Sequence, residues 1–188
     1  MEFKDYQKYR WFYTSSNSLV VGGKSAEQNE ELLKRLKAQK ENFLLMHTVE
    51  PGSPFSVILV NKPKQSDIKE SAIFTASFSR AWKQKKNKSN VDLFYLSDIF
   101  KLKSMKLGTW GVRKKIKTFS VPLSLVLTKQ KGKLRAVPEK SVKKFLIKIV
   151  PGDIEKSLLL TKLKAFLPKV SQEEILSALP SGGIKLVK

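Results

Sequence analysis

Charge is the feature of this sequence that most constrains what it can fold into and bind. Lys and Arg number 37 against 16 Asp and Glu, so the 188 residues carry a formal net charge of +21. The excess is concentrated: residues 80–135 hold 16 basic and 2 acidic residues, whereas residues 1–79 hold 11 and 9. A solubilising coat predicts a more even division, so the skew indicates a surface that binds a polyanion.

The composition excludes several classes of functional site. The sequence has no Cys and one His, which rules out disulfides, Cys-based zinc sites, a Cys nucleophile and multi-His metal clusters. We therefore expect no cofactor and no metal. No apolar run approaches the roughly 18 residues of a membrane span, and the first residues do not resemble a secretion signal. We expect a soluble, cytoplasmic protein with no membrane partner.

Hydrophobic patterning predicts a hairpin, a helix and a second pair of strands. Residues 9–14 and 19–23 are β-prone runs around a polar turn, which is typical of a hairpin. Ser25 and Gln28 form a capping-box pattern ahead of leucines at helical spacing, so a helix should run to about residue 40. The next strands are expected at residues 43–46 and 56–60, with a Pro- and Gly-containing loop at residues 47–54 between them.

The following residues predict a second helix and several more strands. A cap at Ser66 or Asp67 begins a helix that extends to about Trp82. Four β-prone runs with Lys-rich connections follow at residues 91–96, 109–113, 119–127 and 134–137. The fold class is therefore α+β, with an antiparallel or mixed β-sheet flanked by two main helices.

After Pro138 the pattern restarts. A strand at residues 145–150, a helix from about Asp153 and a last helix capped by Ser171 are expected. Some 50 residues are too few to stand alone, so they read as a small αβ annex. We divide the chain into a main domain at residues 1–137, which is expected to bind a polyanion, and a C-terminal annex at residues 138–188.

Four segments, at residues 9–30, 47–58, 70–82 and 108–115, carry a resemblance to a known family. The opening run Tyr9-Arg10-Trp11-Phe12-Tyr13-Thr14, followed by Leu19-Val20-Val21-Gly22-Gly23, is the most specific. In order and spacing the segments resemble the NFACT-R domain, the RNA-binding domain of ribosome quality control factors such as RqcH. The annex is similar to the segment that follows this domain in archaeal relatives.

The resemblance implies partners. Full-length members of the family bind tRNA and the large ribosomal subunit on stalled complexes, and some extend the nascent chain without a template. They also carry an NFACT-N domain, a helix-hairpin-helix region and a long coiled coil, for which 188 residues have no room. The expectation is a stand-alone NFACT-R protein that binds tRNA or ribosomal RNA, with a separate protein supplying the NFACT-N function.

Basic clusters in the central segment are the leading candidates for contacting RNA. One such cluster is usually a solvated face, but three clusters among only two acids favour binding to phosphates. Trp82 would stack on a base, although core packing is the stronger interpretation of each Trp. The predicted RNA-binding residues are Arg80, Trp82, Lys83, Lys85, Lys86, Lys88, Lys101, Lys103, Lys106, Arg113, Lys114, Lys115 and Lys117.

Two weaker candidate sites remain, and no catalytic residue is assigned. One is a loop in which an imidazole accompanies hydroxyls and a carboxylate, a set that general acid-base chemistry uses. It comprises His47, Thr48, Glu50 and Ser53. The other is the turn before the first helix, whose free N–H groups can hold one phosphate. It comprises Lys24 and Ser25.

Three functions stay open at this point. The leading hypothesis is an RNA-binding protein that acts on tRNA or ribosomal RNA at the large ribosomal subunit, in quality control of stalled nascent chains. The first alternative is an RNA-modifying or RNA-processing enzyme that uses the loop at residues 47–53. The second is a ribosome-anchored adaptor whose annex docks a protein partner.

Overall fold

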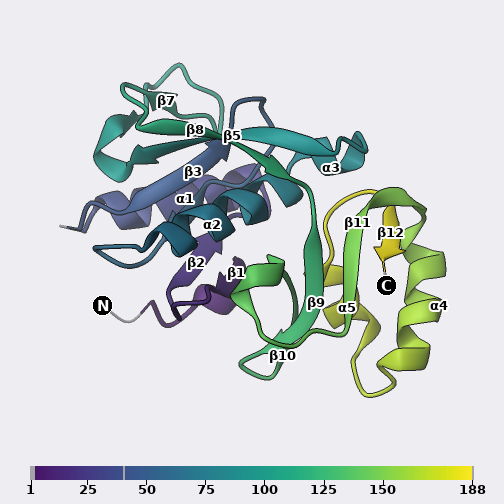
Figure 1. Cartoon of the computed structure of the whole chain (residues 1–188). Coiled ribbons are helices and arrows are strands. Elements are labelled where there is room, and N and C mark those ends of the chain that lie inside the picture. Colours follow the sequence, from purple (N-terminus) through teal and green to yellow (C-terminus); the bar gives the residue numbers. More distant parts are fainter. Residues whose placement is uncertain (1–2, 40, 188) are drawn as a thin grey trace.

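A six-stranded antiparallel sheet forms the larger part of the molecule (Figure 1). The computed structural model describes residues 3–39 and 41–187. The strands lie in the order β1-β2-β4-β3-β5-β8, and every neighbouring pair is antiparallel. Their bounds are β1 Arg10–Tyr13, β2 Leu19–Gly22, β3 Leu44–Thr48, β4 Ser56–Ile58, β5 Lys88–Tyr95 and β8 Lys117–Pro122.

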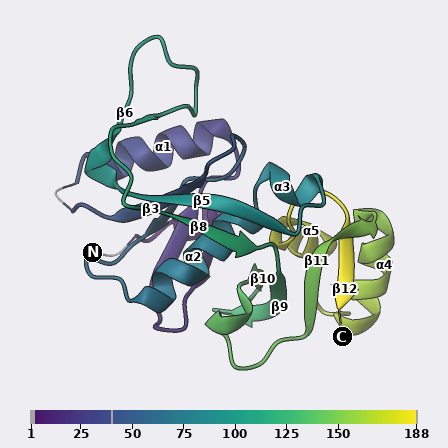
Figure 2. The same ribbon diagram turned by 45° about the horizontal axis from the view of Figure 1, so that its top comes forward.

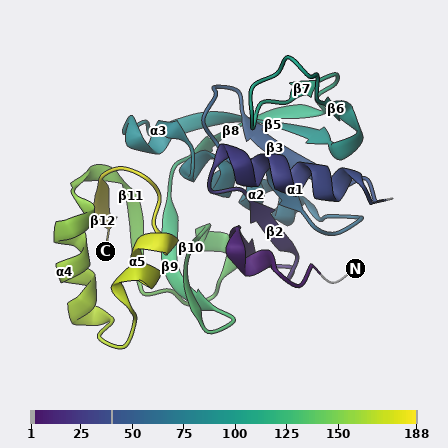
Figure 3. The same cartoon turned by 180° about the vertical axis from the view of Figure 1, so that it is seen from behind.

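One long helix covers each face of this sheet. Figure 1 shows α2, Gln65–Ser77, in front of the strands, and Figure 3 shows α1, Ala26–Lys37, in front when the molecule is seen from behind. Successive side chains of a strand point to opposite faces. In β2, Val21 accordingly packs in the apolar cluster under α1 and Val20 in the cluster under α2. The α+β prediction with two main helices is confirmed.

The hairpin and the first helix begin where the sequence predicts. β1 and β2 pair with Arg10 opposite Gly22. The Ser25 hydroxyl then accepts the Gln28 backbone N–H at 3.3 Å, and the Gln28 side-chain oxygen accepts the Lys24 backbone N–H at 3.0 Å. The strand pairing therefore places Arg10 beside the residues that start α1.

The second helix is interrupted, so the prediction of one continuous helix to Trp82 is wrong. α2 ends at Ser77, and a separate short helix, α3, spans Arg80–Lys83. The cause is Ser79, whose hydroxyl donates to the Ala76 carbonyl at 2.7 Å and accepts the Ala81 N–H at 3.1 Å. A side chain that satisfies both ends in this way stops one helix and caps the next.

Asp67 ties the turn of the hairpin to the start of α2. The N-cap of α2 is Lys64 rather than Ser66 or Asp67, and the Asp67 carboxylate accepts the Lys64 N–H at 2.7 Å. The same buried carboxylate accepts the hydroxyls of Thr14 and Ser16, each at 2.5 Å. Burial raises the pKa of Asp67, but these hydrogen bonds outweigh it and hold the pKa below its ordinary value.

The C-terminal residues form a second antiparallel sheet with two helices. Its strand order is β10-β9-β11-β12, and the Ser171 hydroxyl caps the last helix by accepting the Glu174 N–H at 3.1 Å, as predicted. The bounds are β9 Leu125–Gln130, β10 Lys133–Val137, β11 Ile147–Ile154, α4 Lys156–Phe166, α5 Gln172–Ala178 and β12 Ile184–Val187.

Several predicted strands differ from the structure. β3 extends through Thr48, so His47 lies in a strand and not in the loop after it. The predicted strand at residues 119–127 is divided between β8 and β9, which belong to different sheets. The predicted strand at residues 109–113 is reduced to β7, Gly111–Val112, which pairs with β6, Ile99–Phe100. β12 was not predicted, because it needs β11 as a partner.

One apolar cluster joins the two sheets. It contains Met46 of the larger sheet together with Leu125 and Ile175 of the C-terminal part. The Trp82 indole N–H also donates to the Gly183 carbonyl at 3.0 Å. The predicted domain boundary after Val137 stays a prediction, and the strands just before it, β9 and β10, pair in the C-terminal sheet.

Replacing Asp67 with Ala should lower the free energy of unfolding by about 2–4 kcal/mol, because buried donors lose their acceptor. Urea unfolding followed by circular dichroism measures the change. Since the folded state depresses the pKa of Asp67, its contribution is present above about pH 4 and is lost as the pH falls through the lower folded-state pKa.

The matched control is Glu173→Gln, at an exposed site in α5, which should change stability by less than about 0.5 kcal/mol. Equal effects of the two substitutions at pH 7 would contradict the role given to Asp67.

Candidate nucleic-acid interface

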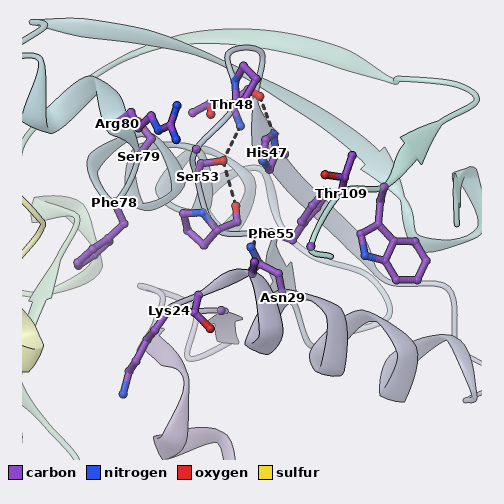
Figure 4. Close-up of a pocket in the computed structure, with 18 of the residues that line it drawn as sticks. Lys24, Asn29, His47, Thr48, Ser53, Phe55, Phe78, Ser79, Arg80 and Thr109 are labelled. Carbon is purple, nitrogen blue, oxygen red and sulfur yellow. Dashed lines mark hydrogen bonds between the residues drawn. The ribbon is translucent and has the colours of Figure 1, made fainter. Parts of the chain in front are cut away.

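A groove of about 720 Å³ opens beside the start of α1, and we call it the α1 groove. Segments that are distant in the sequence converge on it, as Figure 4 shows. The lining residues come from residues 23–29, 47–55, 78–83 and 107–112, with Arg10, Asp92, Phe94 and Ser181 in addition. The groove therefore exists only in the folded chain, where strand pairing and helix packing bring these segments together.

Two glycines let the walls of the groove approach closely. Gly52 has a φ of +106°, its carbonyl accepts the Arg80 N–H at 2.9 Å, and a Cβ here would lie 2.6 Å from the Arg80 side chain. Gly108 has a φ of +74°, and a Cβ there would lie 2.7 Å from the Cβ of Ala26 in the first turn of α1. Both positions need the left-handed backbone that glycine adopts without strain.

Glu30 fixes the loop that forms one wall. This buried carboxylate on α1 accepts the Lys101 ammonium at 2.8 Å and the Gly108 N–H at 3.1 Å. Burial raises the pKa of Glu30, but these hydrogen bonds outweigh it, so the pKa lies below its ordinary value. Lys101 also donates to the carbonyls of Lys106 and Thr109. The ammonium of Lys101, predicted to contact RNA, is thus held by internal contacts.

Four cationic side chains line the α1 groove: Arg10, Lys24, Arg80 and Lys83. Within residues 3–39 and 41–187, none of them forms an ion pair with a carboxylate. The carboxylate that shares the lining, Asp92, accepts the Thr118 hydroxyl at 2.5 Å and lies 3.3 Å from the Lys115 ammonium. The groove therefore carries positive charge that the described protein does not neutralise.

Arg10 is a groove residue that the sequence analysis missed. Its guanidinium lies 4.4 Å from the ring centroid of Phe78. Burial lowers the pKa of Arg10 to about 10, and repulsion from Arg135 contributes. The signal in the sequence was weak, because Arg10 lies outside the basic middle third to which the charge count drew attention. Its position beside Lys24 follows only from the pairing of β1 with β2.

The predicted cluster after α2 is only partly available. Trp82 is fully buried, the core role that the sequence analysis favoured over base stacking. Lys85 pairs with Asp153, and Lys86 pairs with Glu50 at 2.7 Å. Of this cluster, Arg80 and Lys83 of α3 line the α1 groove.

The remaining predicted cations lie on the surface outside the groove. The connection between β6 and β7 projects from the molecule in Figure 2 and carries two of them, three follow between β7 and β8, and β5 and β8 carry one each. These exposed residues are Lys88, Lys103, Lys106, Arg113, Lys114, Lys115 and Lys117. Their contact with RNA stays a prediction.

The hydrogen bonds of the His47–Ser53 segment are those of a structural turn. The Ser53 hydroxyl accepts the Thr48 N–H at 3.0 Å and donates to the Pro54 carbonyl at 3.1 Å, and the Thr48 hydroxyl donates to the Glu50 carbonyl. The His47 Nδ1–H donates to the Thr48 carbonyl at 2.7 Å, because a carbonyl only accepts. Among the described contacts, no hydrogen bond joins His47 to Ser53, so the pair lacks the geometry of a base and its nucleophile.

His47 is held as a neutral ring. Its imidazole stacks on Phe55 with the ring centroids 4.5 Å apart. Burial lowers the pKa of His47, while the hydrogen bond to the Thr48 carbonyl and the charge of Asp92 act in the opposite direction. The positive charge of the groove at neutral pH therefore comes from Arg and Lys alone.

Among the described residues there is neither a metal-binding cluster nor a membrane-spanning helix. No cluster of three or more His, Asp or Glu side chains is arranged to hold a metal ion. No helix in residues 3–39 and 41–187 combines the length and apolar character needed to cross a membrane.

Residues 8–114, more than half of the chain, match the family described as the NFACT protein RNA binding domain. The chain belongs to this family. The matched residues include all four segments that line the α1 groove as well as Arg10. An NFACT-R domain therefore supplies the groove, and its lining is completed by Ser181 of the C-terminal part.

Two individual proteins are similar to this chain in sequence. The chain is 28% identical to "Archaeal Rqc2 homolog aRqcH" of Methanocaldococcus jannaschii over 205 aligned residues, covering 100% of this chain and 30% of that protein. It is 32% identical to "Ribosome quality control complex subunit NEMF homolog" of Drosophila melanogaster over 85 residues, covering 43% of this chain and 8% of that protein. The chain thus spans a minor part of each relative's length.

A solved structure shares the fold. The C-terminal part of the fibronectin/fibrinogen-binding protein from Streptococcus suis is 25% identical and superposes with a TM-score of 0.53. The match covers 61% of this chain and 45% of that one.

Two glycine substitutions separate the close contact between Gly108 and α1 from the free-energy cost of a left-handed backbone. Gly108→Ala and Gly132→Ala both place a side chain at a left-handed backbone, with φ of +74° and +76°, but a Cβ at Gly132 meets nothing within 4 Å. Gly132→Ala should lower the free energy of unfolding by about 1–2 kcal/mol, and Gly108→Ala by more, because the backbone of α1 blocks its Cβ. Thermal unfolding compares the two, and equal losses would contradict close packing of this wall.

The single imidazole can be titrated by NMR. We expect its midpoint below about 6.5, the ordinary value for His, because burial disfavours the charged ring. The stability linked to His47 is then present above that ordinary pKa and is lost as the pH falls below it. Asp92→Asn should lower the pKa further, whereas Glu50→Gln, at an exposed carboxylate, should leave it unchanged. A midpoint above the ordinary value would show that the ring is not buried as described.

Proposed function

We propose that the protein binds tRNA or ribosomal RNA at the large ribosomal subunit and acts in ribosome-associated quality control of stalled nascent chains. The α1 groove holds backbone phosphates, and the exposed lysines outside it extend the contact. The observation that carries this proposal is the set of unpaired cations, Arg10, Lys24, Arg80 and Lys83, around one groove in a member of an RNA-binding domain family. Phosphates are the anions that such a set attracts in RNA.

The distribution of acids supports the same reading. Lys85 and Lys86 are paired with carboxylates, and Lys101 is occupied by Glu30. The groove cations are left without such partners in the described chain. Positive potential is therefore concentrated where the surface is concave, and concave walls of low dielectric focus the field.

The names of the relatives support the cellular setting. One relative is named as a homolog of a ribosome quality control complex subunit, and the other is named as an archaeal Rqc2 homolog. The chain spans 30% of the archaeal relative, so the activity of that whole protein is a proposal for this one. RNA and the large ribosomal subunit are the partners we propose, and the cytoplasm is the proposed location.

Filter binding to tRNA at several salt concentrations tests the function. The logarithm of the binding constant should fall linearly with the logarithm of the salt concentration, with a slope of about −0.9 for each duplex phosphate contacted. Affinity that is negligible at low salt, or independent of salt, would contradict RNA binding by this protein.

A pair of charge reversals tests the site. Arg80→Glu with Lys83→Glu should reduce tRNA affinity about ten- to a hundredfold, because two groove contacts become repulsive. The matched control is Lys162→Glu with Lys169→Glu, which makes the same change in net charge at exposed positions in α4 and the turn after it. The control should lose much less affinity, and equal losses would show attraction by net charge alone.

A further inference from the structure

The α1 groove has two chemically different ends. Figure 4 shows Lys24 and Arg80 on one side and Thr109 on the other, with Ser53 and Phe55 between them. The cationic residues Lys24 and Arg80 thus come from one side of the groove, and the loop that Glu30 anchors forms the other. A ligand with an anionic group at one end and an uncharged group at the other would match this arrangement.

The cationic end comprises Arg10, Lys24 and Arg80. Burial lowers the pKa of Arg10 and of Lys24, and repulsion from Arg135 lowers both further. The Nε of Arg135 is buried and has no hydrogen-bond partner among the described residues. Cations that are partly removed from water and repel one another are stabilised when an anion binds between them. A phosphate group has the charge and the acceptor oxygens for this position.

The apolar end comprises Leu107, Trp110 and Val112. Leu107 is 55% exposed and Val112 is 42% exposed, although both are apolar and line the groove. Exposed apolar surface within a concave site is typical of ligand-binding grooves. A flat, uncharged group of the size of a nucleobase would cover it.

We propose that the α1 groove holds one unpaired nucleotide of the bound RNA, with its phosphate at the cationic end and its base at the apolar end. The inference rests on the proposed RNA-binding function and names the part of the RNA that this site takes. The volume of about 720 Å³ suits one small ligand. In a duplex, bases are stacked and paired, so a base cannot reach the apolar end while its phosphate occupies the cationic end.

Substitutions at two exposed residues test the cationic end and the apolar end of the groove separately. With a single-stranded oligoadenylate as the probe, Lys24→Gln should lower affinity and reduce the salt slope by about 0.7, because one phosphate contact is lost. Leu107→Ser should lower affinity about three- to tenfold and leave the salt slope unchanged, since an apolar contact releases no counterion. Lys162→Gln, at an exposed lysine of α4 outside the groove lining, is the matched control and should leave both the affinity and the salt slope nearly unchanged.

Tryptophan fluorescence reports occupancy of the apolar end directly. Trp11 and Trp82 are 1% and 0% exposed and are not part of the groove lining, whereas Trp110 is 9% exposed and lines the groove. Oligoadenylate should quench the fluorescence of the wild-type protein, and Trp110→Phe should abolish most of the quenching while RNA still binds. The same sequence annealed to oligouridylate should bind more weakly and should not quench. Unchanged circular dichroism spectra confirm that the variants are folded.

The outcomes are separable. If the duplex binds as tightly as the single strand, or if Leu107→Ser and Trp110→Phe change neither affinity nor quenching, the nucleotide site is overturned while RNA binding stands. If neither oligoadenylate nor tRNA binds at low salt, the proposed function fails and this inference fails with it.

Discussion

The carboxylate of Glu30 is the interaction on which the α1 groove depends. It holds Lys101 and the Gly108 N–H together, and Lys34 adds a third contact at 3.2 Å. Burial disfavours the ionised form of this carboxylate, but its fixed donors together outweigh that cost, and removing one partner would leave a buried charge poorly paired. Through Gly108 it seats the loop on the first turn of α1, so a short-range contact inside the protein sets the width of an external groove.

Other acidic side chains also stabilise the fold through internal contacts. Among the described residues, none of them forms an ion pair with the cations of the α1 groove. Asp67 binds the hairpin turn to α2, and Glu70 accepts the hydroxyl and N–H of Ser15. Asp92, although it lines the groove, accepts from Thr118. A chain with 37 basic and 16 acidic residues can place unneutralised charge at one site in this way without losing its internal ion pairs.

Short-range sequence patterns predicted most of the helices and strands. The α1 groove, in contrast, is formed by contacts between segments that are distant in the sequence. The caps at Ser25 and Ser171 depend on neighbours within three residues, so the sequence alone locates them. The break at Ser79 requires knowing that its hydroxyl satisfies both α2 and α3, which helical periodicity does not reveal. Arg10 lies in the same groove as Lys24 because β1 pairs with β2. Leu107 lines that groove because its loop packs on α1. The basic middle third of the sequence supplies two of the groove cations, Arg80 and Lys83, whereas Arg10 and Lys24 lie outside it.

The central claim is that RNA enters the α1 groove rather than coating the lysine-rich exterior. Photocrosslinking of thiouridine-substituted RNA to the intact protein, followed by mass spectrometry of the linked peptides, tests it most directly. The account predicts crosslinks within residues 23–29, 78–83 and 107–112, the segments that line the groove. Crosslinks confined to residues 113–117 and to the C-terminal sheet and its helices would contradict it.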